Sequence, residues 1–514
     1  MKQYPSIFND VIGPVMIGPS SSHTAASVRI GALIRQLAGD GLESVRFVFD
    51  RRGSLAATYN TQGSDFGLAG GLLGYAPHEK GILTALEQAE AKGLRIGFAL
   101  EDVGPGHPNA YYVTAISSAG ALRLTAASVG GGMVEVTEVE GFPVHIDGGF
   151  YEALLVSPSP LGEDGLALWR RAMPGCAIET QRGQDGRYLH RGYSDAPPDA
   201  AALRAAFPSI RLAGPVLPVV NQMRPQAPFV TAEEIAAAGR DKPLWQLAAQ
   251  YESARSGLGE EAVLQRMEEL VQLLAQSLAS GGGINAPGGR ILPDQAQLLE
   301  NSPYLGGSLE KKILRYVTRF MELKSAMGVF VAAPTAGSCG CLPGTVFALG
   351  DELGLSVEEK AKAMLCAGLI GVLIASKSTF AAEVCGCQAE CGAGSGMAAA
   401  ACAHVLGATA EQGLTAASMA LQNILGMVCD PVANRVEVPC LGKNIMAAMN
   451  ALASANMARA GFAGVIPLDQ TIAAMDSVGR SIPRELRCTG LGGLSVTEAA
   501  QCIRFRLEGE CASC

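Results

Sequence analysis

The sequence predicts a multidomain protein: an N-terminal α+β domain over residues 1–150, a small α+β unit over 151–220 and an all-α domain over 221–514. Three observations predict this arrangement. Strand-like runs alternate with Ala/Leu-rich helical stretches in the first region. Pro, Asp and Arg are densest in the second, and the third is Ala-rich with apolar residues at three- and four-residue spacing. The length of 514 residues also suggests about three domains.

Charge and composition narrow the class of protein. The chain has 39 Lys+Arg and 48 Asp+Glu, a net charge of −9, so it lacks the basic footprint of a nucleic-acid-binding protein. With 48% hydrophobic residues and 63 glycines it is typical of a tightly packed globular chain. The start, MKQYPSIFNDVIGP, does not resemble a signal peptide, and the longest apolar run is too short for a bilayer. We therefore expect a cytoplasmic protein that binds neither nucleic acid nor membrane.

The strands of the first domain are expected at VRFVFD (45–50), LRIGFAL (94–100) and MVEVTEVEGFPVHI (133–146). The next region can be divided into strand, helix, strand, strand, helix and strand between residues 152 and 220. This βαββαβ order is that of the small ferredoxin-like unit. It also resembles the ACT regulatory fold, although no motif indicates which effector it would bind.

The helical region begins at a capping box. Thr231 stands at an N-cap position and Glu234 follows three residues later, ahead of apolar residues at helical spacing. Glycine and proline loops then separate Ala-rich helices. Small side chains let helices approach closely, which suits a compact bundle around a buried site.

Two hydroxyl-rich loops are candidates for binding a small anion. IGPSSSHTAASVRIG places Ser20, Ser21, Ser22, His23 and Thr24 directly before a helical pattern, where backbone N–H groups and hydroxyls could bind a carboxylate. The alternative is an ordinary N-cap with solvent-facing serines. AAPTAGSCGCLPG (332–344) combines Thr335, Gly337 and Ser338, whose backbone freedom suits close approach of a ligand. Its alternative is a plain helix–helix loop.

The cysteines indicate a metal site. Of 14, all but Cys176 lie between Cys339 and Cys514, and such crowding in a large chain without a secretory signal favours metal binding over disulfides. Some of these cysteines could instead be small buried apolar side chains, as we expect for Cys366 and Cys402.

Two loops carry the cysteines that are candidate metal ligands. EVCGCQAECGAGSG carries Cys385, Cys387 and Cys391, and CDPVANRVEVPC carries Cys429 and Cys440 at its ends. A redox pair would need CxxC spacing, and zinc would favour two C-x₂-C knuckles. Three thiolates from separate loops suit an iron–sulfur cluster with one iron open to substrate.

Several long motifs together resemble one family. GPVMIGPSSSHTAASVRIG, GGINAPGG, AAPTAGSCG, GCQAE and CDPVANRVEVPC are similar to signatures of the bacterial iron–sulfur L-serine dehydratases, or L-serine ammonia-lyases. The resemblance covers nearly the whole chain, with the family's β and α parts fused. It implies an α,β-elimination that converts L-serine to pyruvate and ammonia, a 4Fe–4S cluster and no pyridoxal phosphate. We expect a homodimer that acts on a small amino acid.

The resemblance also assigns roles to residues. Cys387, Cys429 and Cys440 would hold the cluster, and a tail cysteine, Cys514 or Cys502, would be a fourth ligand. His23 would be the catalytic proton-transfer residue. Substrate binding falls to polar and glycine residues of the motifs: Ser20, Ser21, Ser22, Thr24, Asp65, Asn109, Thr335, Gly337 and Ser338.

One position departs from the family pattern. Gln62 stands where the family has a histidine, before Gly63, Ser64 and Asp65. Because glutamine cannot act as a general base, either His23 transfers the proton or the substrate has changed. L-cysteine and L-threonine are alternative substrates, and a non-catalytic amino-acid sensor is a further alternative.

Overall fold

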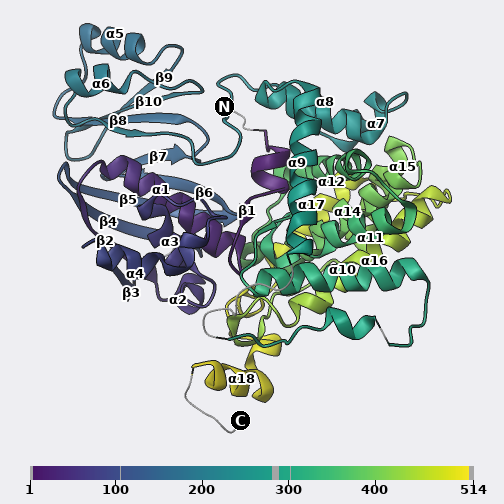
Figure 1. Ribbon diagram of the computed structural model, residues 1–514. Helices are drawn as coiled ribbons and strands as arrows, with labels where there is room; N and C mark the ends of the chain where they lie inside the picture. The colour runs from purple at the N-terminus through teal and green to yellow at the C-terminus, as the bar shows by residue number, and fades with distance from the viewer. Residues whose placement is uncertain (1–3, 105, 281–288, 301, 509–514) are drawn as a thin grey trace. The chain divides into compact units, whose positions relative to one another are not determined.

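The computed structural model describes residues 4–104, 106–280, 289–300 and 302–508 (Figure 1). Two compact units divide the chain. Unit 1 comprises the described residues up to Ser22, Gly130–Gly132 and those from Gln226 onward; unit 2 comprises His23–Val129 and Met133–Pro225. The predicted division into an α+β region with sheets and a helical region is confirmed. Within the described ranges, every helix is too short or too polar to cross a lipid bilayer.

The N-terminal segment packs with the helical unit, whereas the sequence placed it in the first domain. Ser6 donates its hydroxyl to Glu252 Oε1 at 2.7 Å, and the Ile7 N–H donates to Glu252 Oε2 at 2.7 Å. The short strand β1 (Val15–Met16) pairs antiparallel with β12 (Phe330–Val331). The helical unit therefore contains a two-stranded antiparallel ribbon, which an all-α domain would lack. The buried Glu252 carboxylate and the pairing of β1 with β12 hold the N-terminal segment against this unit.

Unit 2 contains a six-stranded sheet of order β3-β2-β4-β5-β6-β7. β2 and β3 are parallel, and the pairs β2–β4, β4–β5 and β6–β7 are antiparallel. Helices α1 (Ala26–Ala38) and α3 (Ser64–Leu73) lie together on this sheet (Figure 1). The strands are β2 (Leu42–Asp50), β3 (Arg95–Glu101), β4 (Ala110–Ser117), β5 (Gly120–Gly130), β6 (Met133–Val139) and β7 (Phe142–Ile146), with short helices α2 (Leu55–Thr58) and α4 (Ala85–Ala91) between them.

A second sheet in unit 2 has four antiparallel strands in the order β11-β8-β10-β9. Successive side chains of a strand point to opposite faces of the sheet, and both faces carry buried apolar residues. On β8, Ala153 and Leu155 pack against Trp169 of α5, whereas Leu154 joins the core of the larger sheet. In chain order the elements are β8 (Tyr151–Ser157), α5 (Glu163–Ala172), β9 (Ala177–Arg182), β10 (Tyr188–Ser194), α6 (Ala200–Ala206) and β11 (Arg211–Ala213).

In unit 1 the helices surround α14 (Cys391–Val405), which packs against α11, α12, α15 and α16 (Figure 1). Small side chains permit this, since the run from Cys391 to Ala403 is buried and consists mainly of Gly and Ala. The predicted capping box of Thr231 and Glu234 is confirmed at the start of α7. The helices are α7 (Ala232–Ala238), α8 (Leu244–Ser256), α9 (Glu260–Ala279), α10 (Ser308–Ser325), α11 (Cys341–Leu353), α12 (Val357–Lys377), α13 (Ala382–Cys385), α15 (Ala410–Gln422), α16 (Cys440–Arg459), α17 (Leu468–Ser481) and α18 (Glu498–Glu508).

The contact between α1 and α3 depends on glycine. A Cβ atom at Gly71 would lie 2.0 Å from the Val28 carbonyl oxygen and 2.7 Å from the Ala32 nitrogen. We expect Gly71→Ala to lower the free energy of unfolding by about 3 kcal/mol, because the two helices must separate. Urea denaturation measures this. Gly97→Ala is the control, since nothing lies within 4 Å of its Cβ position, and an equal loss in both variants would contradict the argument.

Candidate metal centre

Two buried thiols and a carboxylate meet in unit 1. The ligand atoms of Cys387, Glu390 and Cys429 all lie within 4.8 Å of one another. The structure thus brings together two of the cysteines that the family resemblance proposed as ligands. Glu390, the last residue of the GCQAE motif, was not singled out from the sequence. A small group of this kind can hold a metal ion or cluster.

The turn that presents Cys387 is held against the segment before Cys429. Gly386 has φ +70°, and a Cβ atom there would lie 2.7 Å from the Met427 carbonyl oxygen, so the close approach requires glycine. The Gln388 N–H donates to that same Met427 oxygen at 3.1 Å. Gln388 Oε1 accepts the Gly426 N–H at 2.9 Å. Gln388 therefore links the two cysteine loops through one backbone and one side-chain hydrogen bond.

Cys440 and Cys391 are the first residues of two helices next to this group. Asn444 of α16 joins them: its Nδ2 donates to the Cys440 carbonyl at 2.8 Å and lies 3.5 Å from Cys391 Sγ. Cys440 Sγ is not among the atoms within 4.8 Å of one another, yet the charge on Cys387, after burial, raises the pKa of the Cys440 thiol. Cys440 is therefore an electrostatic neighbour of the group.

The hydroxyl-rich loop of unit 1 lies against the same carboxylate. Thr335 Oγ1 donates to Glu390 Oε1 at 2.7 Å, and the Ser338 N–H donates to Thr335 Oγ1 at 3.3 Å. A Cβ atom at Gly337 would lie 2.8 Å from Glu390 Oε1, so this glycine leaves room for the carboxylate. Ser21 Oγ accepts the Ala336 N–H at 3.2 Å. Thr335 and Gly337, two predicted substrate-binding residues, thus adjoin Glu390, and Ser338 is bonded to Thr335.

Ser20 and Ser22, the neighbours of Ser21, are buried. The sequence allowed solvent-facing serines at this loop as an alternative. Burial of all three serines does not fit that alternative.

The group is electrostatically asymmetric. Hydrogen bonds from Cys391 and Cys429, together with the charge of Lys443, hold the pKa of Cys387 well below its usual value. Burial and then the Cys387 charge raise the pKa of Glu390 to about 8. Lys443 Nζ also donates to the Val428 carbonyl at 2.7 Å and pairs with Asp430 Oδ1 at 2.9 Å. An ammonium close to the cysteines offsets negative charge in the pocket.

This donor set fits a thiolate-bound metal group. Sulfur ligands select soft metals and iron–sulfur clusters, and two of the three converging ligand atoms are the sulfurs of Cys387 and Cys429. A second lysine, Lys324, is fully buried and donates to the Val436 carbonyl within the CDPVANRVEVPC loop. Buried cations beside several thiols are what an anionic cluster needs.

In unit 2, His23 is fully buried, and its Nε2 lies 2.8 Å from Thr58 Oγ1. Burial lowers the pKa of His23 to about 3, so the imidazole is neutral at physiological pH. Thr24 Oγ1 donates to the backbone carbonyl of Gln62 at 2.9 Å, and the Gln62 side chain is buried. The predicted proton-transfer histidine thus lies close to the residue that replaces the family's histidine.

Two further predicted residues of unit 2 have unusual surroundings. Burial raises the pKa of Asp65, in the first turn of α3, to about 6. Asn109 is fully buried, and no described residue forms a hydrogen bond with either atom of its side-chain amide. An unsatisfied buried polar group costs about 1–3 kcal/mol, so Asn109 is suited to a ligand.

Of the two predicted tail ligands the structure describes Cys502, which is not part of the group. Cys514 lies outside the described residues, as does most of the motif GGINAPGG. Cys502 is a partly exposed free thiol on α18. Cys488, which the sequence did not single out, is buried and packs with Cys387 and Cys429. Only the excess of cysteines could have indicated it, because no spacing motif contains it.

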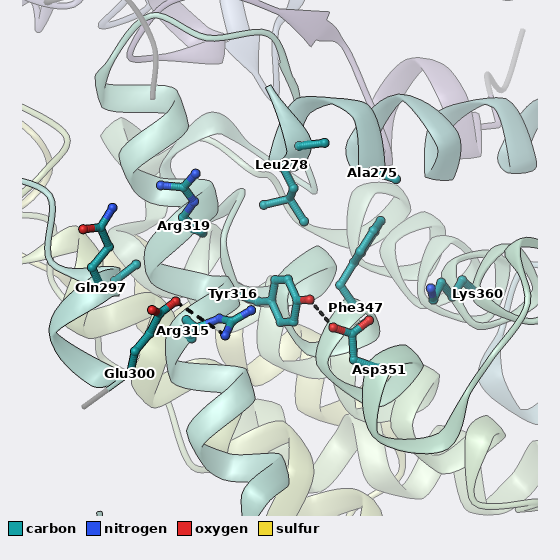
Figure 2. Close-up of a pocket in the computed structure, with 12 residues that line it drawn as sticks. Ala275, Leu278, Gln297, Glu300, Arg315, Tyr316, Arg319, Phe347, Asp351 and Lys360 are labelled. Atoms are coloured by element: carbon teal, nitrogen blue, oxygen red, sulfur yellow. Dashed lines mark hydrogen bonds and ion pairs between the residues drawn. The ribbon is translucent and has the colours of Figure 1, made fainter. Parts of the chain in front are cut away.

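A cavity of about 520 Å³ in unit 1 is lined by other residues, from α9 to α12 (Figure 2). Its charged side chains already have partners: Arg315 pairs with Glu300 at 3.7 Å, and Tyr316 donates its hydroxyl to Asp351. None of the candidate site residues lines it. We therefore do not place the functional site there.

Comparisons with known proteins identify both parts of the chain. The family described as serine dehydratase alpha chain matches residues 230–495, and the family described as serine dehydratase beta chain matches residues 10–139. The "Probable L-serine dehydratase, alpha chain" of Latilactobacillus sakei is 42% identical over 189 residues, which are 37% of this chain and 90% of that protein.

Two proteins of Bacillus subtilis (strain 168) match different parts of the chain. Its "Probable L-serine dehydratase, alpha chain" is 37% identical over 253 residues, 48% of this chain and 84% of that protein. Its "Probable L-serine dehydratase, beta chain" is 44% identical over 160 residues, 31% of this chain and 71% of that protein. The chain is thus similar to both kinds of chain at once.

The buried neutral His23 makes stability dependent on pH. Its pKa falls from 6.5 to about 3 on folding, so the unfolded chain binds an extra proton between these values, and acid favours unfolding. We expect wild-type protein to lose up to about 1.4 kcal/mol more per pH unit than His23→Gln below pH about 6. Urea denaturation at several pH values measures this difference. His78→Gln, at an exposed site, should follow wild type; the same slope in all three proteins would contradict the assignment.

Proposed function

The chain belongs to the serine dehydratase family, and we propose that it is an L-serine ammonia-lyase that forms pyruvate and ammonia. The observation that carries this proposal is the contact between a cysteine–carboxylate group and a hydroxyl-rich loop. Cys387, Glu390 and Cys429 converge, and Thr335 bonds directly to Glu390. A metal group and a small polar substrate could be bound side by side there.

We propose that the metal group is a 4Fe–4S cluster held by Cys387, Cys429 and Cys440. When bound, such a cluster supplies a Lewis acid that makes the β-hydroxyl of serine a better leaving group. Lys443 and Lys324 lie near the thiols and favour their deprotonated, ligating form. Thiolates at the start of a helix, as at Cys440 in α16, are further stabilised by the helix dipole.

We propose that Ser21, Thr335 and Ser338 of unit 1 orient the substrate, with Ser20, Ser22 and Gly337 shaping the same loops. Their backbone N–H groups and hydroxyls suit a carboxylate. Asn444 Nδ2 donates to the Gly337 carbonyl at 2.8 Å, and Asn444 Oδ1 accepts the Cys341 N–H at 3.0 Å. The loop is therefore preorganised by α16, the helix that begins at Cys440.

The sequence proposed Thr24, Asp65 and Asn109 of unit 2 for substrate binding and His23 for proton transfer, and we keep Thr24 and Asn109 as substrate-binding residues. A pKa near the working pH makes the better general base. With a pKa of about 6, Asp65 meets this condition, whereas His23, with a pKa of about 3, does not. We therefore propose that Asp65, rather than His23, accepts the α-proton of the substrate. Neutral His23 would position Thr58 through the hydrogen bond between them.

A different substrate is the second candidate. Gln62 is buried beside Thr24 at a position where the family has a histidine, and this favours a test of L-cysteine and L-threonine alongside L-serine. Equal amounts of anaerobically purified enzyme are assayed with each amino acid by the 2-oxo acid formed. The proposal requires L-serine to give the highest kcat/KM.

We propose that residues 151–220 form a ferredoxin-like unit of the ACT kind. Support comes from the order of elements, β8-α5-β9-β10-α6-β11, and from the sheet order β11-β8-β10-β9, in which the first and third strands are central.

The cluster proposal is tested by replacing one ligand. We expect anaerobic Cys387→Ser to lose most of its iron and sulfide and its serine dehydratase activity, because serine is a poor ligand for soft iron–sulfur groups. Iron and sulfide analysis and a pyruvate assay measure both losses. Cys366→Ser, in the apolar interior of α12, is the control that should keep both. Full activity in iron-free wild-type enzyme would refute the proposal.

The side-chain amide of Asn109 gives a second test. Asn109→Ala removes no hydrogen bond to a described residue, so we expect stability to change by less than about 1 kcal/mol while KM for serine rises about tenfold or more. Steady-state kinetics and urea denaturation measure the two effects. Asn221→Ala is the contrast, because its amide donates to Asp147 Oδ2 at 2.7 Å and its loss should destabilise the fold. An unchanged KM for Asn109→Ala would argue against a substrate role.

A further inference from the structure

We propose that Cys488 is an additional thiolate ligand of the metal group held by Cys387 and Cys429. This inference rests on the proposed function. Cys488 lies on neither of the two cysteine loops but in the segment that follows α17. It is 6% exposed and belongs to one packed cluster with Ala382, Cys387 and Cys429.

The backbone places Cys488 beside Cys429. The Cys429 N–H donates to the Leu486 carbonyl at 2.8 Å, and the Cys488 N–H donates to the Cys429 carbonyl at 2.8 Å. These two bonds form a parallel bridge between Cys429 and Arg487. The two cysteines therefore sit on adjacent, hydrogen-bonded stretches of backbone.

The side chains form a continuous series of sulfurs. Hydrogen bonds link the thiol of Cys429 to Cys387 on one side and to Cys488 on the other. A further hydrogen bond links Cys387 to Cys391. In contrast, Cys366 and Cys402 are buried within helices among apolar side chains, where a thiol acts as a small apolar group. Cys488 lies against the proposed ligands themselves.

The conformation of Cys488 is strained. Its φ of +58° lies in the left-handed region, which residues other than glycine seldom adopt. Such strain persists only where the surrounding structure enforces it, and it is concentrated at functional sites. Ala433 and Asn434, in the loop that links Cys429 to Cys440, also have positive φ values, 49° and 55°.

Contacts after Cys488 hold the following segment against the Cys429 loop. The Leu494 N–H donates to Asp430 Oδ2 at 2.9 Å, and Ser495 Oγ donates to the Pro431 carbonyl at 2.9 Å. A Cβ atom at Gly493 would lie 2.5 Å from Asp430 Oδ2. The segment is thus fastened to the two residues that follow Cys429, and Cys488 is held facing the same cluster.

A fourth thiolate has a definite chemical consequence. Three cysteines leave one metal position without a protein ligand, and the Cys488 thiol, after losing its proton to solvent, could occupy it. Cys488 would then protect the metal group from losing the metal atom at that position.

The test uses anaerobically purified full-length enzyme and its iron rather than its activity. After mild oxidation, we expect wild-type protein to keep its iron and Cys488→Ala to lose about a quarter of it, with the electron paramagnetic resonance signal of a three-iron cluster. Cys402→Ala, a buried cysteine of α14, is the matched control and should behave as wild type. Circular dichroism shows whether each variant is folded, and Cys488→Ser serves if the alanine variant is not.

Other outcomes are decisive as well. If Cys488→Ala and Cys488→Ser retain iron as wild type does, the inference is overturned. If Cys502→Ala instead yields the three-iron signal, a tail cysteine is the ligand and the inference is also overturned. If wild-type enzyme contains neither iron nor sulfide, the proposed function itself fails, and that result is distinguishable from the other two.

Discussion

Several thiols converge at one buried point in unit 1, and this convergence imposes an electrostatic cost that the neighbouring structure must offset. Thiolates are the forms that bind metal, and like charges repel strongly where water is excluded. Hydrogen bonds from neighbouring thiols lower the pKa of Cys387, whereas hydrogen bonds with Cys387 and Cys488 raise the pKa of Cys429. Lys443 lies beside the pair, and α14 and α16 begin at Cys391 and Cys440. Lysine ammonium groups, helix dipoles and thiol hydrogen bonds together lower the electrostatic cost of negative charge in this pocket.

The geometry of the convergence is maintained by amides rather than by an apolar core. Gln388 links the GCQAE turn to residues 426 and 427, and Asn444 links α16 to the Thr335–Cys341 loop. Each amide has donors and acceptors, so one side chain can satisfy several buried backbone groups on different segments. The packing of α14 against four helices supplies a rigid base for these links. Displacement of either amide would move a cysteine loop without unfolding the bundle.

Motif spacing predicted part of this arrangement, and tertiary packing determined the rest. The α+β and helical regions and the capping box at Thr231 follow from periodicity and local hydrogen bonding, which a short window of sequence contains. The position of Glu390 against Thr335 does not, since it depends on a contact between segments 55 residues apart. Cys488 likewise reaches Cys429 only through two backbone hydrogen bonds. Burial of His23, which changes its basicity, is also a tertiary property.

The polar residues of unit 2 show why motif membership alone does not define a role. Thr24 gives its hydroxyl to the Gln62 carbonyl, His23 is bonded to Thr58, and Ser64 Oγ donates to the His23 carbonyl at 3.4 Å. These side chains already form hydrogen bonds within the fold and so position their neighbours. A ligand would have to break those bonds to interact with them. Asn109 differs, since its buried amide has no bond to any described residue and a ligand would gain the full interaction. Within this unit the Asn109 amide is therefore available to a ligand, whereas the hydroxyls around it already have partners.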